Sequence, residues 1–377
     1  MALPSAFRHA LLSASCIAGM AVNAQALISF NDGHDRLFVK GRASTGWNSN
    51  ISANQDGKSD NITTLSLGLD YERKAGIIGV NGSLNVDSSF YAKYEDENAT
   101  DPSASLEFTK AEGRVTGSWL TSVARNHRDN AAANIRTESW EYTSGLKLRY
   151  PVISRYSISG GLDFSRQNFS DDNLGLVDID SYALSADLLY AYTSERDLFA
   201  GIRVRHDETS GLLRGDDYAT YIGLTGKILP KLTGTVRLGY QQRQDDGHSY
   251  GAWASSTELT WMPSKKLSFA GTISKDISTT ATDGSTDTLT GSLQANYALT
   301  AKISTFASLY AGHSRFFDRL LQANRSDDFL GGSTGLHYSL NEHFKATLSY
   351  GMHQNWSTLE YADYIRRTLT LTLNSRF

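Results

Sequence analysis

The chain has 377 residues, and its 36 lysines and arginines against 40 aspartates and glutamates give a net charge of −4. This balance argues against a nucleic-acid-binding protein, which would carry a basic surface. The mean hydropathy is −0.36, and no apolar run approaches the ~20 residues of a membrane-spanning helix. The chain contains only 5 prolines but 19 tyrosines, a composition that suits long β-strands with aromatic ends.

Residues 1–26 have the organisation of a secretory signal peptide. Arg8 supplies a weakly basic start, an apolar stretch follows, and Ala24-Gln25-Ala26 fits an A-x-A cleavage site. A lipoprotein signal at Cys16 fits less well, because the residue three positions before it is not the expected leucine. Cys16 is the only cysteine, so the mature chain should contain no disulfide. A short lead over residues 27–36 should follow the cleavage site.

From residue 37 onward, segments of alternating apolar and polar residues are separated by breaks that are alternately short and long. Alternation is typical of strands whose two faces meet different surroundings, and the unequal breaks are typical of an outer-membrane β-barrel. We therefore predict an all-β fold, a closed antiparallel transmembrane barrel over residues 37–377, without a plug or periplasmic domain. We expect about eighteen strands: 37–50, 61–73, 77–94, 103–110, 114–126, 139–150, 156–169, 181–193, 198–209, 217–229, 232–244, 252–262, 267–278, 287–299, 303–317, 329–340, 344–356 and 364–377. Sixteen strands is the alternative, because no strong turn signal fixes residues 95–128.

The alternation also indicates which face of each strand meets lipid. In residues 344–356, the apolar face begins at Phe344 and ends at Trp356, while the other face carries Lys345 and Thr347. Aromatic residues at both ends of an apolar face suit the two membrane interfaces. A soluble β-sandwich or propeller is the other all-β reading, and it would show mixed patterning.

The last strand carries an assembly signal. Apolar and polar residues alternate from Thr368 to Asn374, and the chain stops at Phe377. A terminal phenylalanine that closes such a strand resembles the signal by which bacterial outer-membrane barrels are assembled, although Ser375 departs from it. We therefore expect the barrel-assembly machinery and outer-membrane lipid as partners, and the Gram-negative outer membrane as the location.

No sequence motif indicates catalysis, a metal or a cofactor. The histidines are scattered singly, without metal-ligand spacing. His337-Tyr338-Ser339 has the H-x-S spacing of outer-membrane phospholipases, but in those enzymes the pair must face lipid. Here Tyr338 takes the lipid face, so His337 and Ser339 should point into the lumen. We therefore expect no enzyme.

The charged residues predicted to face the lumen are the group that says most about function. Strand direction and alternation place seven basic residues near the periplasmic mouth: Lys40, Arg114, Lys147, Arg149, Lys227, Lys345 and Arg376. The same reasoning places three more, Arg203, Arg205 and Arg237, at mid-wall. A basic entrance in a low-dielectric wall would attract an anionic polymer. The alternative is that these charges pair into a salt-bridge mesh that stiffens the wall.

Four aromatic residues fall on predicted lumen faces: Phe199, Tyr221, Phe306 and Tyr310. Rings that face a lumen could stack against the apolar faces of sugars. The alternative is that they only pack against the wall.

The whole mature chain resembles the outer-membrane β-barrel porins encoded in exopolysaccharide gene clusters. Leu65-Ser-Leu-Gly-Leu-Asp-Tyr-Glu-Arg-Lys74, Gly113-Arg-Val-Thr-Gly117 and the run of tyrosine-ended strands carry the resemblance. It implies a barrel of about eighteen strands that exports a polysaccharide, together with a periplasmic polysaccharide-export protein that has no membrane-spanning part of its own. Composition and spacing show no sugar polymer, because fold does not give function.

Two further functions remain open from the sequence. A general diffusion porin for small solutes would need a long inward constriction loop, and the longest breaks here span only about a dozen residues. A structural or adhesive surface barrel would need long aromatic loops, whereas these breaks are short and acidic.

Overall fold

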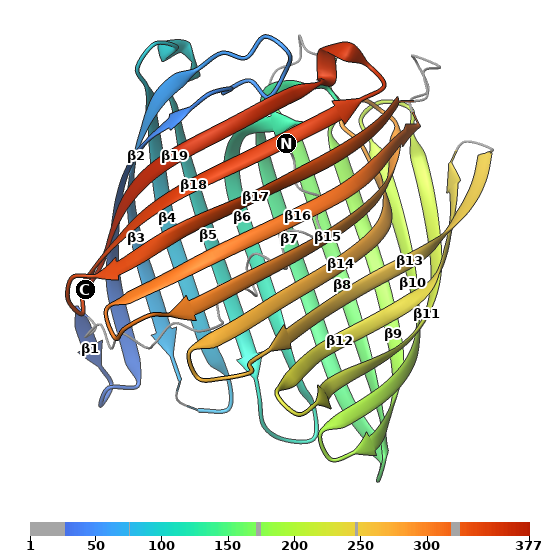
Figure 1. Ribbon diagram of the computed structural model, residues 1–377. Coiled ribbons are helices and arrows are strands. Elements are labelled where there is room, and N and C mark those ends of the chain that lie inside the picture. Colours follow the sequence, from blue (N-terminus) through green and yellow to red (C-terminus); the bar gives the residue numbers. More distant parts are fainter. Residues whose placement is uncertain (1–26, 75, 171–174, 246–247, 318–324) are drawn as a thin grey trace.

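A computed structural model describes residues 27–74, 76–170, 175–245, 248–317 and 325–377 (Figure 1). The expected signal peptide, residues 1–26, lies outside the described residues. The described strands are β1 (Ile28–Phe30), β2 (Asp35–Asn48), β3 (Asp60–Arg73), β4 (Gly79–Tyr91), β5 (Ala99–Lys110), β6 (Thr116–Asn130), β7 (Ile135–Ile153), β8 (Tyr156–Phe169), β9 (Ile179–Thr193), β10 (Arg196–Thr209), β11 (Arg214–Leu229), β12 (Leu232–Asp245), β13 (His248–Trp261), β14 (Leu267–Thr279), β15 (Ser285–Ala298), β16 (Ile303–Phe317), β17 (Arg325–Ser339), β18 (Phe344–Ser357) and β19 (Tyr364–Arg376). Single 3₁₀ turns, η1 (Glu95–Glu97) and η3 (Glu360–Ala362), lie in two of the loops. Within these ranges, no helix has the length and apolar character needed to cross a membrane.

The strands β2 to β19 form a closed antiparallel barrel. Each pairs with the next in the chain, and β19 pairs back onto β2 through contacts such as Leu371 opposite Thr45. This confirms the predicted fold class and the predicted eighteen strands. Closure gives every one of these strands a hydrogen-bonded neighbour on both sides, which matters because lipid offers the backbone no hydrogen-bond partner.

Outward faces follow the predicted alternation. Leu371 is 53% exposed and Leu293 is 50% exposed, whereas the intervening lumen-facing residues contact the neighbouring strands and each other. The short β1 pairs with β2 below the end of β19, where the backbone of Phe377 exchanges two hydrogen bonds with Val39. In this way β1 extends the ladder beyond the carboxyl terminus.

Short connections gather at the lower end of the barrel in Figure 1, with the carboxyl terminus and β1. Residues 154–155 and 230–231 are such turns, and the longer residues 49–59 lie at the other end. In this class of barrel the short turns face the periplasm. The break expected between residues 150 and 156 is shorter than predicted, because β7 passes through Pro151 with a register irregularity and ends at Ile153.

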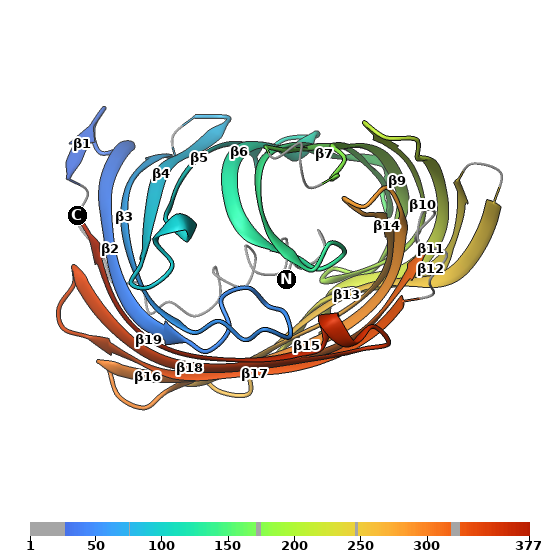
Figure 2. The same ribbon diagram turned by 90° about the horizontal axis from the view of Figure 1, so that it is seen from above.

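The barrel wall has a seam between β5 and β6. Their pairing stops at Ser103 opposite Ala124, although β5 begins earlier and β6 continues to Asn130. Pro102 lies on β5 directly above the last pair and has no N–H to donate. Above the seam, β6 and β7 leave the wall and lie inside the outline of the barrel (Figure 2).

β6 continues to Asn130 and β7 begins at Ile135, so the predicted connection between residues 126 and 139 is too long, and only residues 131–134 form the turn. The prediction of a loop that continues to residue 102 is wrong as well, because β5 begins at Ala99.

A second seam lies between β13 and β14. Only Ser255–Trp261 pairs with β14, and the outer end of β14 turns inward, so that Ile277 is 1% exposed. The Ile277 carbonyl has lost its strand partner and instead accepts hydrogen bonds from the side chains of Arg205 and Gln241. Two inward-turned strand ends thus narrow the outer half of the lumen.

Candidate functional site

At the periplasmic mouth, Lys40 and Arg376 face the lumen on neighbouring strands. Lys40 Nζ lies 2.6 Å from an Asp70 carboxylate oxygen. Arg376 lies 2.8 Å from Glu72, and its guanidinium stacks over the ring of Phe38 at 3.8 Å. Both cations are therefore neutralised by the acids of β3.

Two more of the predicted mouth residues are also paired. Arg149 lies 2.8 Å from Asp197, and Lys227 lies 3.0 Å from Glu195. For these residues the structure favours the salt-bridge mesh over a field of free positive charge. Exposed pairs of this kind contribute about 0–1 kcal/mol each.

The remaining three mouth residues differ from one another. Lys147 and Lys345 are exposed, and neither has an ion-pair partner among the described residues. Arg114 was expected in the lumen, and this placement is wrong. It lies in the turn after β5, and its guanidinium stacks at 4.8 Å over Tyr150, whose ring is on the outward face.

The mid-wall arginines are paired and largely covered. Arg205 is only 9% exposed, because the outer end of β14 folds over it. Breaking a buried ion pair costs about 3–5 kcal/mol, so these side chains are not available to a passing anion. The pairs are Arg203–Asp276 at 2.7 Å, Arg205–Asp217 at 2.8 Å, Arg205–Asp276 at 2.9 Å and Arg237–Asp187 at 2.7 Å.

Phe199 and Tyr221 pack against the wall, as the alternative expected. Each is 7% exposed, and the guanidinium of Arg237 lies 4.9 and 5.4 Å from the two rings. A Cβ on Gly223 would stand 2.2 Å from the Phe199 ring, so glycine is required there. These two rings offer no free face to a sugar.

Phe306 and Tyr310, by contrast, belong to a row of rings along β16 and β17. We name this row the aromatic strip, and its members are Phe306, Tyr310, Phe329 and Phe316. Phe306 lies nearest the periplasmic end, opposite Gly335, and Tyr310 follows it opposite Gly331. Phe329 lies further out, opposite Gly312, and Phe316 lies near the outer end. Phe306 and Tyr310 are half-buried, so part of each ring faces the lumen.

Histidine side chains extend the strip on its β18 side. His337 stacks with Phe306 at 4.9 Å and shares a 2.8 Å hydrogen bond with Thr347, which places it in the lumen. His353 stacks with Tyr310 at 5.8 Å. No group of three potential metal ligands occurs in the part of the chain that the structure describes.

The outer half of the lumen is crossed by residues 125–140, which we name the cross-lumen hairpin (Figure 2). His127 lies between Asp101 of the near wall at 2.6 Å and Glu138 of the hairpin itself at 3.0 Å. Three contacts tie the tip to the far wall: Arg366 donates to Asp129 at 2.7 Å, Arg325 donates to the Ala132 carbonyl at 3.0 Å, and Asn134 donates to the Tyr361 carbonyl at 3.0 Å.

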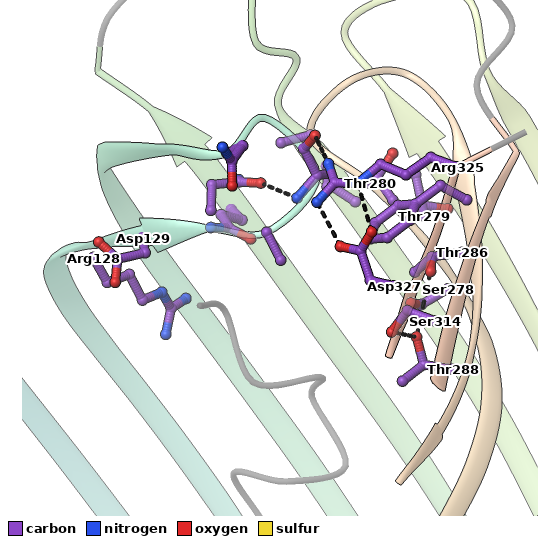
Figure 3. A pocket seen from close by; sticks show the side chains of 18 of the residues that line it. Arg128, Asp129, Ser278, Thr279, Thr280, Thr286, Thr288, Ser314, Arg325 and Asp327 are labelled. Carbon is purple, nitrogen blue, oxygen red and sulfur yellow. Dashed lines mark hydrogen bonds and ion pairs between the residues drawn. The ribbon is translucent and has the colours of Figure 1, made fainter. Parts of the chain in front are cut away.

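A cavity of about 250 Å³ lies between the cross-lumen hairpin, the inward end of β14, and the walls formed by β8 to β10 and by β15 to β19 (Figure 3). We name it the outer cavity. Its neutral polar lining consists of Asn130, Asn134, Ser165, Gln167, Ser181, Ser278, Thr279, Thr280, Thr286, Thr288, Ser314 and Asn355. The outer rings of the aromatic strip, Phe316 and Phe329, also line it. This cavity could not be predicted from the residue pattern, because its walls depend on the two seams.

Comparison with known proteins identifies one family. The chain matches the family model described as "Putative beta-barrel porin 2" over residues 38–377, which is almost the entire barrel. Among curated proteins, no sequence matches the chain.

Several solved structures are similar in arrangement. The OccK2 (OpdF) structure of Pseudomonas aeruginosa is 10% identical, with 91% of this chain and 97% of that chain covered at a TM-score of 0.49. OpdK of the same organism, solved with vanillate, is 9% identical over 90% and 99% of the two chains, with a TM-score of 0.48. The FrpB iron transporter of Neisseria meningitidis is 11% identical. The match covers 90% of this chain and 81% of that chain, with a TM-score of 0.45.

Proposed function

Since the chain belongs to the family described as "Putative beta-barrel porin 2", and is thus a non-enzymatic outer-membrane channel, we propose that it exports a sugar polymer. The cargo is an exopolysaccharide chain that enters from the periplasm and leaves at the cell surface. Its route follows the lumen face of β16 to β18.

The aromatic strip carries this proposal. The negative face of an aromatic ring attracts weakly positive C–H groups, and a sugar presents such groups on its apolar face. Phe306 and Tyr310 offer two rings in sequence along the strand direction, as a linear polymer would need. Hydroxyl pairs lie beside them, such as Ser308 and Ser333 at 2.7 Å, and these can exchange hydrogen bonds with the sugar hydroxyls.

The partner in this proposal is a periplasmic polysaccharide-export protein. Its support is the resemblance to porins of exopolysaccharide gene clusters, together with the charge at the short-turn end. Lys147 and Lys345 are among the exposed cations there that have no acidic partner among the described residues, and they offer contacts to an acidic periplasmic surface.

Passage of a polymer requires the cross-lumen hairpin to move. Its far-wall contacts are few, and one of them is the ion pair between Asp129 and Arg366. Beyond Ala124 the hairpin has no backbone pairing with β5. Its displacement therefore breaks side-chain contacts but leaves the barrel closed.

A diffusion porin for small solutes is the second candidate, and the same hairpin favours it. The expected argument against a porin was the absence of a long constriction loop. That argument does not hold, because strand ends at residues 125–140 narrow the lumen in place of a loop.

Deletion of the gene in its native host separates the two candidates. Export predicts that surface polysaccharide falls severalfold and that polymer accumulates in the periplasm, with recovery when the wild-type gene is restored. Unchanged surface polymer together with slower uptake of small solutes would overturn export and support the porin.

A further inference from the structure

We propose that the outer cavity is a binding site for an uncharged sugar unit. This inference rests on the proposed function and narrows it, because it names the chemical class of the cargo.

Neutral hydrogen-bonding groups dominate the lining of the outer cavity. Thr279, Thr280, Thr286 and Thr288 come from the facing ends of β14 and β15, and Ser314 comes from β16 (Figure 3). A hydroxyl can both donate and accept, so a group of them matches the hydroxyls of a sugar without fixing a charge. Thr288 and Ser314 already share a hydrogen bond of 3.1 Å, and each oxygen keeps further capacity.

One wall of the outer cavity is aromatic. Phe316, Phe329 and Tyr364 line it, and the first two continue the aromatic strip from the periplasmic half. Phe316 and Phe329 are only 9% and 6% exposed, and the Arg325 guanidinium covers the Phe316 ring at 4.5 Å, so these two rings close the wall. Tyr364 is half-buried, and a sugar bound here can place its apolar face on that ring and its hydroxyls toward the threonines.

Every charged side chain in the lining already has an opposite charge beside it. The pairs are Arg128–Glu141 at 3.2 Å, Asp129–Arg366 at 2.7 Å, Arg166–Asp180 at 3.5 Å, Arg205–Asp207 at 3.5 Å and Arg325–Asp327 at 2.6 Å. A carboxylate on the sugar would have to displace one of these acids and leave it unpaired, which is costly in a buried site. The lining therefore selects against an acidic sugar.

The volume of the outer cavity fits a single sugar residue of a polymer. Small-molecule sites usually enclose ~300–1,000 Å³, and the outer cavity, at about 250 Å³, lies just below that range. It suits one sugar residue held while its neighbours extend along the strip.

Calorimetry on the full barrel in a detergent without sugar headgroups tests the proposal. The neutral probes are cellotetraose and maltotetraose, and the acidic probe is tetragalacturonate. We expect at least one neutral probe to bind tenfold or more tightly than tetragalacturonate. Equal or tighter binding of tetragalacturonate, or no binding of either neutral probe at millimolar concentration, would overturn the proposal.

A double variant locates the site. Thr288→Val with Ser314→Ala removes both partners of one hydrogen bond, so neither is left unpaired, and should weaken neutral binding tenfold. Thr272→Val with Ser292→Ala removes a matched pair, 2.6 Å apart on the lumen face of β14 and β15, and should leave binding unchanged. Equal effects of both variants would contradict the assignment to the outer cavity. Heat-dependent gel mobility checks that each barrel is folded.

Failure of this inference is distinguishable from failure of the export function. If gene deletion leaves surface polymer unchanged while neutral probes still bind, export is wrong and the cavity is a sugar site of a solute channel. If deletion abolishes surface polymer while only tetragalacturonate binds, export stands and the uncharged class is wrong.

Discussion

Asp129 on β6 and Arg366 on β19 form an ion pair of 2.7 Å across the lumen, although 237 residues separate them in the sequence. Both side chains are mostly buried. The pair is one of the contacts that hold the tip of the cross-lumen hairpin against the far wall.

Breaking this pair should widen the channel. Asp129→Asn or Arg366→Gln removes this buried ion pair, a change that costs about 3–5 kcal/mol in buried sites, and weakens the attachment of the hairpin. We expect a larger mean single-channel conductance in planar bilayers for each variant. The exchanged double variant, Asp129→Arg with Arg366→Asp, should restore part of the wild-type value. Identical conductance in all of them would show that the hairpin does not limit flow.

A charge on the outward face should destabilise the barrel. Leu293→Arg or Leu348→Arg places a cation where the side chain is about half exposed to lipid, with an expected loss of ~2–4 kcal/mol if the site lies at the midplane. Gln294→Arg, on the lumen face next to Leu293, is the matched control and should cost much less. Urea unfolding in lipid vesicles measures both, and equal losses would contradict the assignment of faces.

Removal of Phe377 should lower the amount of folded barrel in the outer membrane. The residue exchanges backbone hydrogen bonds with Val39 and stacks on His343 at 4.9 Å, so it joins the last strand to the first. Export of the chain to the periplasm should be unaffected. Normal outer-membrane levels of the truncated chain, measured in fractionated cells, would speak against this.

Charge at the mouth should affect ions more than sugars. Lys147→Gln should shift ion selectivity toward cations, because Lys147 has no ion-pair partner among the described residues. Lys227→Gln should shift it less, since Glu195 lies 3.0 Å from that lysine. Reversal potentials should be compared at low salt. There the Debye length exceeds its value of ~8 Å at physiological salt, so the lysine charges are screened less. An equal shift in the two variants would contradict the pairing.

Strand number and lipid faces could be predicted from the sequence because lipid and water impose opposite demands on alternate residues. The rule fails at residues 125–140, where both faces of the hairpin meet polar lumen contacts and no lipid face remains. The strand predicted to begin at residue 103 begins at Ala99, and Pro102 is tolerated within it because β5 has lost its β6 neighbour there. The outer cavity could not be predicted at all, since residues from β6, β14 and β16 meet only after the seams form.

The position of Arg114 shows a further limit of predicting side-chain direction from alternation. Extending the alternation of β6 by two residues places it in the lumen, yet the strand begins at Thr116. Beyond a strand end, the long side chain follows its local partner, here the ring of Tyr150.

The most direct test of the export function is the amount of surface polysaccharide in a deletion strain that carries Phe306→Ala with Tyr310→Ala. Phe199→Ala, which removes a ring buried in the wall, is the control. If the aromatic strip guides a sugar polymer, the double variant should assemble normally, surface polymer should fall severalfold, and polymer should accumulate in the periplasm. Wild-type surface polymer with a correctly assembled double variant would contradict the account.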